Sequence, residues 1–323
     1  MSNLTIAVLG KNGYSSNLAK KGTSTDITLY NFKKGENTLT FVEPTRYPDR
    51  LAPLFFACSM AKIAIVVVDE LNQNLGESLV MLQTCRITEG FFILQNFISH
   101  DKIKSLVKDT ILENYKIIPD DPIKLNEILL NELLKIAQIS LSDLDQTYGT
   151  VPVDHAFNVK GIGTVILGIV TKGMIKVHSL LKILPGTKTT QVRSIQKHDD
   201  NFDYSIQGDR VGLAVKNVKV EDIERGTVLT NDPNVKGSNQ IKAEASLVNY
   251  WNSPLKEGMI LHLGHWMQFL NCKVEAITDA GNWRKPTLTL NLEKEIIYNP
   301  GDIAVLTYLD SGKLRVIGTI QLT

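Results

Sequence analysis

The sequence predicts an α/β module followed by two small all-β modules, and three observations lead to this fold class. In about the first 145 residues, short apolar runs alternate with segments of helical spacing, a pattern typical of a mostly parallel sheet covered by helices. After that point β-branched residues dominate, and turn signals recur about every 8–12 residues, as they do in small barrels. The polar segment 231–237 divides this β-rich part in two. We therefore expect domains at residues 1–147, 148–234 and 235–323.

In the first module, apolar runs predict strands and two spaced patterns predict helices. The runs lie at residues 4–9, 39–42, 63–68 and 91–94. The third run is unbroken and aliphatic, which indicates a strand covered on both faces of a parallel sheet. Residues 99–101 offer caps for a helix in which Ile103, Leu106, Val107 and Ile111 recur at helical spacing. Asp121 and Pro122 begin another helix, whose apolar face reaches residue 137. Members of that face are Ile128, Leu129, Leu133, Leu134 and Ala137.

In the β-rich part, glycine-containing turns predict where strands end. In the second module these turns lie at residues 161–163, 171–173, 185–186, 208–209 and 225–226. In the third they lie at residues 256–258, 300–302 and 311–312. This spacing predicts two small barrels.

Composition indicates a globular protein of the cytoplasm. Hydrophobic residues make up 43% and charged residues 21% of the 323 residues, which are ordinary proportions. The net charge of +1 does not mark the whole chain as a polyanion binder, and we predict no DNA partner. No apolar run approaches the roughly 18 residues that span a bilayer, so we expect no membrane partner.

The spacing of cysteines and histidines predicts no metal site. Cys58, Cys85 and Cys272 form no CxxC pair and no zinc pattern, so we expect reduced, buried thiols. His262 and His265 are three residues apart in an expected strand, where their rings face opposite sides.

One stretch at the start of the second module carries a family resemblance. Residues 151–168 read VPVDHAFNVKGIGTVILG and resemble the opening of the second domain of EF-Tu-type translation factors. They are especially similar to archaeal SelB, the selenocysteine-specific factor, and to the SelB-like group sometimes called EF-Pyl, which is proposed to handle pyrrolysyl-tRNA. The likeness continues at residues 171–173, 192–196, 208–212 and 223–226. The resemblance implies a degenerate P-loop GTPase fold (a G-domain-like α/β module) followed by two β-barrels like EF-Tu domains 2 and 3.

The resemblance also implies a nucleotide site after the first strand, where the sequence departs from the family pattern. A working P-loop reads GxxxxGK[ST]: its backbone N–H groups wrap the phosphates, its Lys reaches them and its hydroxyl holds magnesium. Residues 10–17 read GKNGYSSN. Gly10 and Gly13 are present, but Ser16 stands at the position of the lysine and Asn17 at that of the magnesium ligand. The nearby cations are Lys11, Lys20 and Lys21.

The other GTPase elements are altered too. Ser24 stands at the position of the magnesium-sensing Thr of the first switch. Residues 43–47 align with the Asp-x-Pro-Gly-His of the second switch, where Arg46 replaces the glycine and Tyr47 the histidine that orients water. The guanine-reading motif near residues 94–97 lacks its Asp. Because phosphoryl transfer needs positioning, metal and charge neutralisation together, we expect no catalytic residues and no required cofactor. Weak binding of GTP or GDP with Mg²⁺ stays open.

In contrast, the residues that the resemblance places at the aminoacyl end of a bound tRNA are kept. Asp154, His155 and Arg210 would form this pocket, with Phe157 as a stacking face for the terminal adenine. Arg and protonated His supply positive potential, and a carboxylate orients them. The competing interpretation is that Asp154 and His155 close a turn and that Phe157 is barrel core. Candidate contacts to the tRNA backbone are Lys160, Lys172, Lys188 and Arg193.

We therefore predict a SelB-like translation elongation factor that binds an aminoacyl-tRNA, selenocysteinyl or pyrrolysyl in type, without effective GTP hydrolysis. The ribosome is a candidate further partner. Two alternatives stay open: a divergent but active GTPase elongation factor, and a ribosome-binding or regulatory relic that does not bind tRNA.

Overall fold

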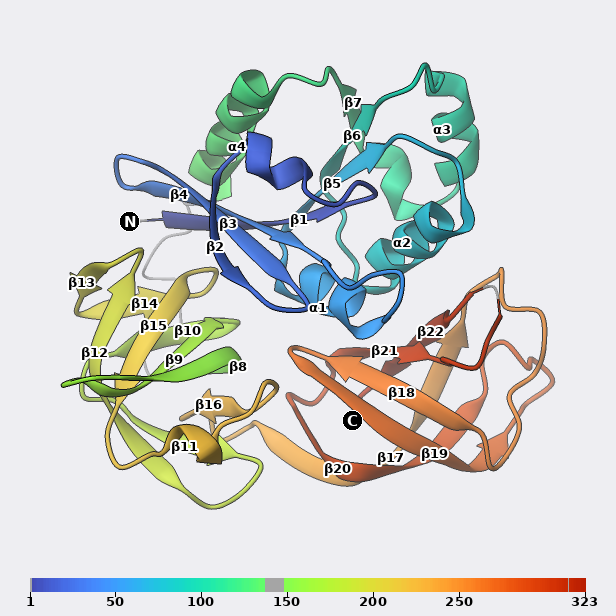
Figure 1. The fold of residues 1–323 in the computed structure, drawn as a ribbon. Coiled ribbons are helices and arrows are strands. Elements are labelled where there is room, and N and C mark those ends of the chain that lie inside the picture. The colour runs from blue at the N-terminus through green and yellow to red at the C-terminus, as the bar shows by residue number, and fades with distance from the viewer. Residues whose placement is uncertain (1, 137–147, 313) are drawn as a thin grey trace. The chain divides into compact units, whose positions relative to one another are not determined.

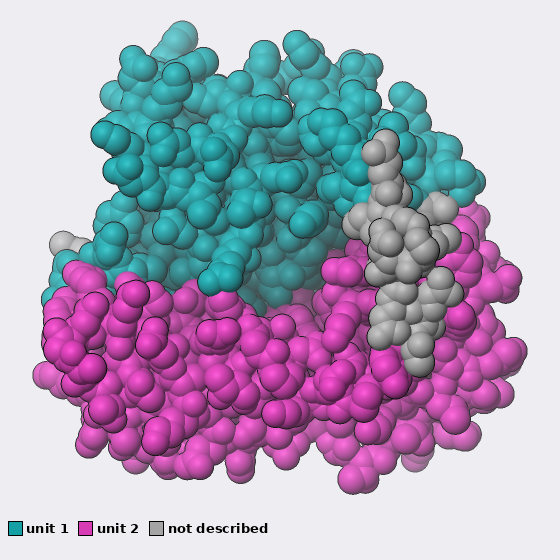
Figure 2. Space-filling view, turned by 180° about the vertical axis from the view of Figure 1, so that it is seen from behind, with its two compact units in different colours: residues 1–138, 248–252, 307–318 teal, residues 139–247, 253–306, 319–323 magenta. Residues whose placement is uncertain are grey.

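The computed structural model describes residues 2–136, 148–312 and 314–323. The chain divides into two compact units, coloured separately in Figure 2. Unit 1 comprises residues 1–138, 248–252 and 307–318, and unit 2 comprises residues 139–247, 253–306 and 319–323. The predicted domain boundary at residue 147 lies outside the described residues. The boundary at residue 234 falls within unit 2, and both boundaries stay predictions.

Unit 1 is built on a seven-stranded sheet (Figure 1). Its order is β2-β3-β4-β1-β5-β6-β7, in which β4, β1, β5, β6 and β7 run parallel while β2 and β3 pair antiparallel. The strands are β1 (Ser2–Leu9), β2 (Lys20–Ser24), β3 (Thr28–Lys34), β4 (Asn37–Glu43), β5 (Ile63–Val68), β6 (Gly90–Leu94) and β7 (Lys116–Ile118). The strands predicted from apolar runs are confirmed as β1, β4, β5 and β6.

The α-helices described in unit 1 are α1 (Ala52–Met60), α2 (Gln73–Thr84), α3 (His100–Val107) and α4 (Pro122–Ile136). Helix α4 begins as predicted, since Asp121 Oδ1 accepts two backbone N–H groups at 3.1 Å. Leu129 and Leu133 pack in the core, but Leu134, expected beside them, is 51% exposed. One residue turns a helix by about 100°, which carries Leu134 off the buried face. Ala137 lies outside the described residues.

A short helical segment follows β1. It is one 3-10 turn, η1 (Tyr14–Asn17), and the chain then enters β2. Gly10 precedes it at φ +92°, and a Cβ there would lie 2.0 Å from the carbonyl oxygen of Val67. The close approach and the positive φ together require glycine.

The core of unit 1 on the α4 side of the sheet uses every second residue of its central strands, for example Leu4, Ile6 and Val8 of β1. Segment 307–318 joins the unit through an ion pair. Arg315 Nη2 lies 2.6 Å from Oε2 of Glu77, whose residue is 3% exposed, and the Arg315 backbone N–H donates to Glu77 Oε1 at 2.8 Å.

In unit 2, the first barrel is a ring of six strands in the order β8-β16-β11-β12-β15-β9, closed because β9 pairs back onto β8. These strands are β8 (Gly149–Val159), β9 (Gly163–Ile169), β11 (Leu180–Leu184), β12 (Thr189–Lys197), β15 (Arg210–Val215) and β16 (Val228–Thr230). The strands β10 (Lys172–Lys176), β13 (Asp200–Phe202) and β14 (Tyr204–Ile206) extend the sheet. The predicted turn at residues 208–209 lies between β14 and β15, and the predicted turn at residues 161–163 connects β8 to β9 and includes the first residue of β9.

The second barrel closes in the order β17-β20-β19-β18-β21-β22. Its strands are β17 (Lys236–Leu247), β18 (Ile260–His265), β19 (Gln268–Thr278), β20 (Thr287–Tyr298), β21 (Ile303–Thr307) and β22 (Val316–Gln321). An α/β module followed by two closed six-stranded barrels confirms the predicted fold class. Across the described residues, no helix has the length and apolarity needed to cross a bilayer.

Candidate functional site

The first barrel brings three of the predicted pocket residues into contact. The Arg210 guanidinium, at the start of β15, binds the Asp154 carboxylate of β8 through two hydrogen bonds, of which Nη2 to Oδ1 measures 3.1 Å. His155 Nδ1 lies 2.7 Å from Asp154 Oδ1. The pairing of β8 with β9 is irregular between Val153 and His155. Such a bulge allows two consecutive side chains to meet the same partners, which a regular strand would prevent.

Asp154 and His155 therefore lie in a bulged strand and do not close a turn. Phe157 is 43% exposed and is not barrel core. Both observations remove support from the competing interpretation, whereas the roles of these residues in binding stay a proposal.

The Asp154 carboxylate is ionised at neutral pH although the residue is 2% exposed. Burial would raise its pKa, but the charge of Arg210 and the hydrogen bonds from His155 and Arg210 outweigh burial and lower the pKa to about 2. An ionised carboxylate only accepts hydrogen bonds, so His155 Nδ1 carries the proton in this contact. The Nε2 atom is then an acceptor in the neutral ring and a donor in the protonated ring.

Arg225 is a further member of the cluster that the predicted set does not contain. Its Nε donates to the Asp154 carbonyl at 3.2 Å. In the sequence, Arg225 appears only as part of the resembling segment 223–226. The Arg225 side chain therefore contacts the backbone of Asp154, whereas Arg210 binds its carboxylate. We name the Asp154, His155, Arg210 and Arg225 side chains the acidic–basic cluster.

An apolar surface continues from the acidic–basic cluster along neighbouring strands. In the sheet register, Leu167 of β9 lies between His155 of β8 and Gly212 of β15. Phe157 lies opposite Val165 in the next row. Residues 165 and 167 alternate with buried core positions of β9, so they face outward. This surface could take the flat face of a base, since bases stack on aromatic side chains.

The predicted backbone contacts differ in their surroundings. Lys160 is exposed. The charge of Lys172 is matched by Asp232 at 2.8 Å, and that of Lys188 by Asp222 at 2.7 Å. These two ion pairs weaken both lysines as phosphate contacts.

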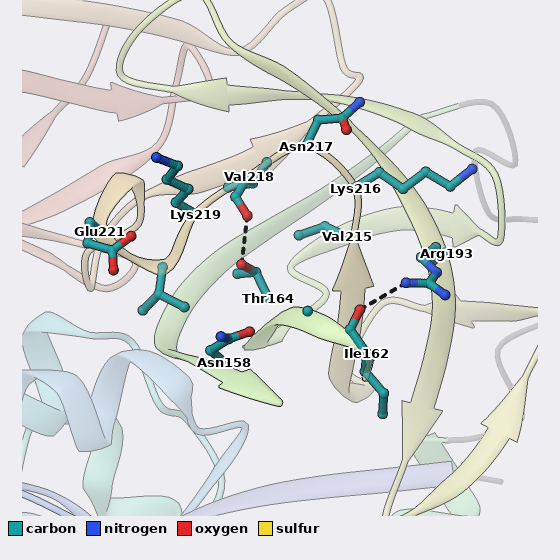
Figure 3. Close-up of a pocket in the computed structure, with 12 residues that line it drawn as sticks. Asn158, Ile162, Thr164, Arg193, Val215, Lys216, Asn217, Val218, Lys219 and Glu221 are labelled. Carbon is teal, nitrogen blue, oxygen red and sulfur yellow. Dashed lines mark hydrogen bonds between the residues drawn. The ribbon is translucent and has the colours of Figure 1, made fainter. Parts of the chain in front are cut away.

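Arg193 is differently placed, because it lines a pocket of about 630 Å³ beside the β8–β9 hairpin (Figure 3). Its Nη1 donates to the Ile162 carbonyl at 2.9 Å, a neutral acceptor, and no carboxylate of the described residues forms an ion pair with this guanidinium. Lys216 and Lys219 line the same pocket, and Glu221 supplies one negative charge. The pocket is therefore positive on balance among these residues.

In unit 1, the loop after β1 contacts a side chain that the sequence does not predict. The carboxylate of Glu43, at the end of β4, accepts the Gly13 N–H at 2.8 Å and the Ser15 N–H at 2.6 Å. Ser16, which is expected at the position of the P-loop lysine, donates its hydroxyl to the Gly13 carbonyl at 2.7 Å. Asn17 is exposed at the end of η1.

A chain of hydrogen bonds connects this loop to the ends of β6 and β7. Tyr14 Oη donates to Asp120 Oδ1 at 2.6 Å, and Gln95 Nε2 donates to Asp120 Oδ2 at 2.6 Å. Lys11 Nζ donates to Gln95 Oε1 at 2.8 Å. Burial and the bond to Asp120 raise the pKa of Tyr14, so its hydroxyl remains a donor. Gln95 lies in the segment that is expected to correspond to the guanine-reading motif, and here its side chain is bound to Asp120.

The switch-like residues are held by contacts within unit 1. The Ser24 hydroxyl lies 3.0 Å from that of Thr28. The Arg46 backbone N–H donates to the Asp26 carbonyl at 3.0 Å, and Arg46 is exposed. Tyr47 is 9% exposed and donates its hydroxyl to the Asn74 carbonyl at 2.8 Å.

Comparisons with known proteins agree with this architecture. A family model described as Elongation factor Tu domain 2 matches residues 163–230. An uncharacterised protein of Methanocaldococcus jannaschii is 35% identical over 324 residues, covering 100% of both chains. The selenocysteine-specific elongation factor of the same organism is 27% identical over 336 residues, which cover 93% of this chain and 71% of that one.

Solved structures share the fold. SelB from Methanococcus maripaludis, in complex with the GTP analogue GppNHp, matches with a TM-score of 0.82 and 24% identity, over 99% of this chain and 79% of that one. A bacterial selenocysteine-specific factor, EF-Sec, matches with a TM-score of 0.80 and 19% identity, over 100% of this chain and 58% of that one.

The α/β module, the two barrels and the domain 2 match place this chain in the EF-Tu superfamily. Within that superfamily, the chain belongs to one family with the uncharacterised protein of M. jannaschii and is homologous to the selenocysteine-specific elongation factor SelB.

Proposed function

We propose that this chain binds an aminoacyl-tRNA through the acidic–basic cluster and does so without hydrolysing GTP. The observation that carries the proposal is the buried, ionised carboxylate of Asp154, which holds Arg210 and His155 in fixed positions. Groups fixed in this way recognise a polar ligand without a large loss of side-chain entropy on binding.

The neighbouring apolar surface supports the same proposal. A charged tRNA ends in an adenosine that carries the amino acid, so a binding protein needs a polar site beside a stacking surface. The outward side chains of Phe157 and Val165 lie one row away from His155 and could supply the stacking surface. The guanidinium of Arg210 and the ring of His155 favour an amino acid with an anionic or strongly polar side chain, and therefore a selenocysteinyl over a pyrrolysyl group.

The contacts in unit 1 support independence from GTP. Residues 10–17 supply no lysine at the P-loop position, and two of their N–H groups are bound to Glu43. The side chain of Gln95, in the segment that resembles the guanine-reading motif, is bound to Asp120, which also accepts the hydroxyl of Tyr14. A bound nucleotide would have to break these contacts.

The test compares binding of one tRNA body in three states: uncharged, charged with selenocysteine and charged with pyrrolysine. Each is measured with and without GTP and Mg²⁺. We expect a charged form to bind at least about tenfold more tightly than the uncharged form, with no change on adding nucleotide. Equal affinity for charged and uncharged tRNA would contradict tRNA selection, and GTP hydrolysis above background would favour the active GTPase alternative.

Two variants separate the parts of the site. Arg210→Ala should lower the affinity for charged tRNA more than for uncharged tRNA, because it alters the amino-acid side. Phe157→Ala should weaken both forms alike, by about 5–100-fold, because stacking of a base does not depend on the amino acid. Binding to the ribosome stays a prediction, which co-sedimentation with ribosomes would test.

A further inference from the structure

The carboxylate of Glu43 lies where an anion would bind in a nucleotide-binding loop. Glu43 is 2% exposed, and each of its carboxylate oxygens accepts a separate backbone N–H: Oε2 from Gly13 at 2.8 Å and Oε1 from Ser15 at 2.6 Å. Gly13 has φ +83°, in the left-handed region. Turns of this kind direct nearby N–H groups into one concave, anion-binding space.

A phosphate in a P-loop is bound by the same kind of donors. Backbone N–H groups hold its oxygens through charge-assisted hydrogen bonds, and a carboxylate presents two oxygens of like charge to those donors. Glu43 stands where the family's second switch has Asp. The side chain of Glu is one methylene longer than that of Asp, so the Glu43 carboxylate extends further from the end of β4. This length explains how it reaches the N–H groups of Gly13 and Ser15.

We propose that the Glu43 carboxylate takes the place of a nucleotide phosphate, so that residues 10–17 form a phosphate-type anion site which the chain fills itself. The proposal rests on the GTP-independence proposed above and gives it a cause. Inorganic phosphate and pyrophosphate are the ligand class, and the site admits them only when Glu43 is removed.

Ser15 supports this assignment independently. It is fully buried, and its hydroxyl has no hydrogen-bond partner among the residues that the structure describes. A buried donor that is left unpaired is costly. A bound oxyanion has more oxygens than a carboxylate and could accept this hydroxyl as well.

The covalent connection explains why the wild-type loop would reject free anions. Glu43 is delivered to the loop by β4, which pairs with both β1 and β3. An intramolecular ligand has an effective concentration in the millimolar range or above, so dilute phosphate competes poorly with it. Asn12 Nδ2 also donates to the Tyr47 carbonyl at 3.4 Å, which joins the loop to the segment after Glu43.

The experiment is chemical rescue of the full chain carrying Glu43→Ala. Thermal unfolding is followed in chloride, formate, phosphate and pyrophosphate at constant ionic strength. We expect Glu43→Ala to unfold at a lower temperature than wild type in chloride and to regain stability in phosphate, pyrophosphate and formate. Its phosphate affinity should exceed that of wild type at least about tenfold. Glu89→Ala, at an exposed glutamate, is the matched control and should show no anion effect.

A second measurement, by amide NMR, tests the proposal if the Glu43→Ala variant does not fold. In amide NMR spectra of wild type, the Gly13 and Ser15 resonances should exchange slowly and stay in place on addition of phosphate. The Glu43→Gln variant keeps the size of the side chain but replaces one acceptor oxygen by a donor NH₂ group. In this variant, addition of phosphate should shift at least one of the Gly13 and Ser15 resonances. Phosphate that moves the wild-type resonances, or a Glu43→Ala chain with unchanged stability and no gain in phosphate binding, would overturn the proposal. Binding of charged tRNA to the same wild-type sample is read separately, so failure of one proposal is not mistaken for failure of the other.

Discussion

At the scale of single residues, the acidic–basic cluster depends on a carboxylate that is both buried and charged. Such a group is stable only while its cations remain, because breaking a buried ion pair leaves an uncompensated charge. Asp154 has the side chain of Arg210 and the ring of His155 as its partners. Substituting either partner should therefore affect stability as well as binding, and experiments must separate the two effects.

We predict that Arg210→Ala lowers the free energy of unfolding by about 3–5 kcal/mol, because Asp154 loses its cation. The double variant Asp154→Asn with Arg210→Ala should recover part of this stability but none of the affinity for charged tRNA. Urea unfolding and tRNA binding measure the two quantities. Lys182→Ala, at an exposed position of β11, is the control, and an equal loss of affinity in that variant would contradict a specific role for Arg210.

The stability of the chain should also fall in acid because of Asp154. Its pKa is lowered to about 2 in the folded chain, below the ordinary value of 3.8. A group with a depressed folded pKa contributes stability above its unfolded pKa and loses it as the pH falls through the folded pKa. We expect a loss of about 2 kcal/mol between about pH 4 and pH 2. Urea unfolding over this range should show a smaller pH dependence in Asp154→Asn, and an unchanged dependence would count against the assignment.

The sequence predicted the cluster better than it predicted the nucleotide loop. Asp154, His155 and Arg210 lie in segments with a strong resemblance, so their proximity could be expected. Glu43 could not be assigned to the loop in the same way, because its role depends on one extra methylene and on the exact end of β4. Arg225 contacts a backbone carbonyl, and such contacts leave no pattern in the sequence.

At the scale of elements, the strands with continuous apolar runs were predictable and the edge strand β2 was not. Its residues are mostly exposed, so the hydrophobic pattern that identifies a buried strand is missing. Similarly, η1 is limited to a single turn because the chain from Lys20 onward, including Gly22, forms β2 and pairs with β3. Local sequence does not reveal this pairing.

The β8–β9 hairpin and the pocket beside it (Figure 3) allow a prediction about RNA backbone contacts. Arg193→Ala should weaken binding of tRNA a few-fold, equally for charged and uncharged forms, and should reduce the slope of log affinity against log salt by about one. The measurement is a salt titration of tRNA binding. Lys172→Ala is the comparison variant. Because Asp232 already matches the charge of Lys172, this variant should weaken tRNA binding less than Arg193→Ala does. A larger effect of Lys172→Ala would contradict the assignment of Arg193 as a backbone contact.

At the scale of the whole molecule, we predict that stability does not respond to guanine nucleotides. A nucleotide present at 100 times its dissociation constant would add about 2.7 kcal/mol to the free energy of unfolding, enough to raise the melting temperature by several degrees. Millimolar GTP or GDP with Mg²⁺ should instead shift it by less than about 1 °C. Differential scanning fluorimetry gives the value, and a shift of several degrees would revive the GTPase alternative.

The ion pair of Glu77 with Arg315 limits how this chain can be cut into pieces. A fragment that ends after residue 138 would retain Glu77 but not the arginine that neutralises it. In that fragment the buried Glu77 carboxylate would lack its cation, and we expect the fragment to precipitate. After limited proteolysis of the full chain, peptides from residues 307–318 should stay bound to the N-terminal unit. A cut in the gene at the end of the α/β module would therefore separate Glu77 from Arg315, because the compact N-terminal unit also includes residues 248–252 and 307–318.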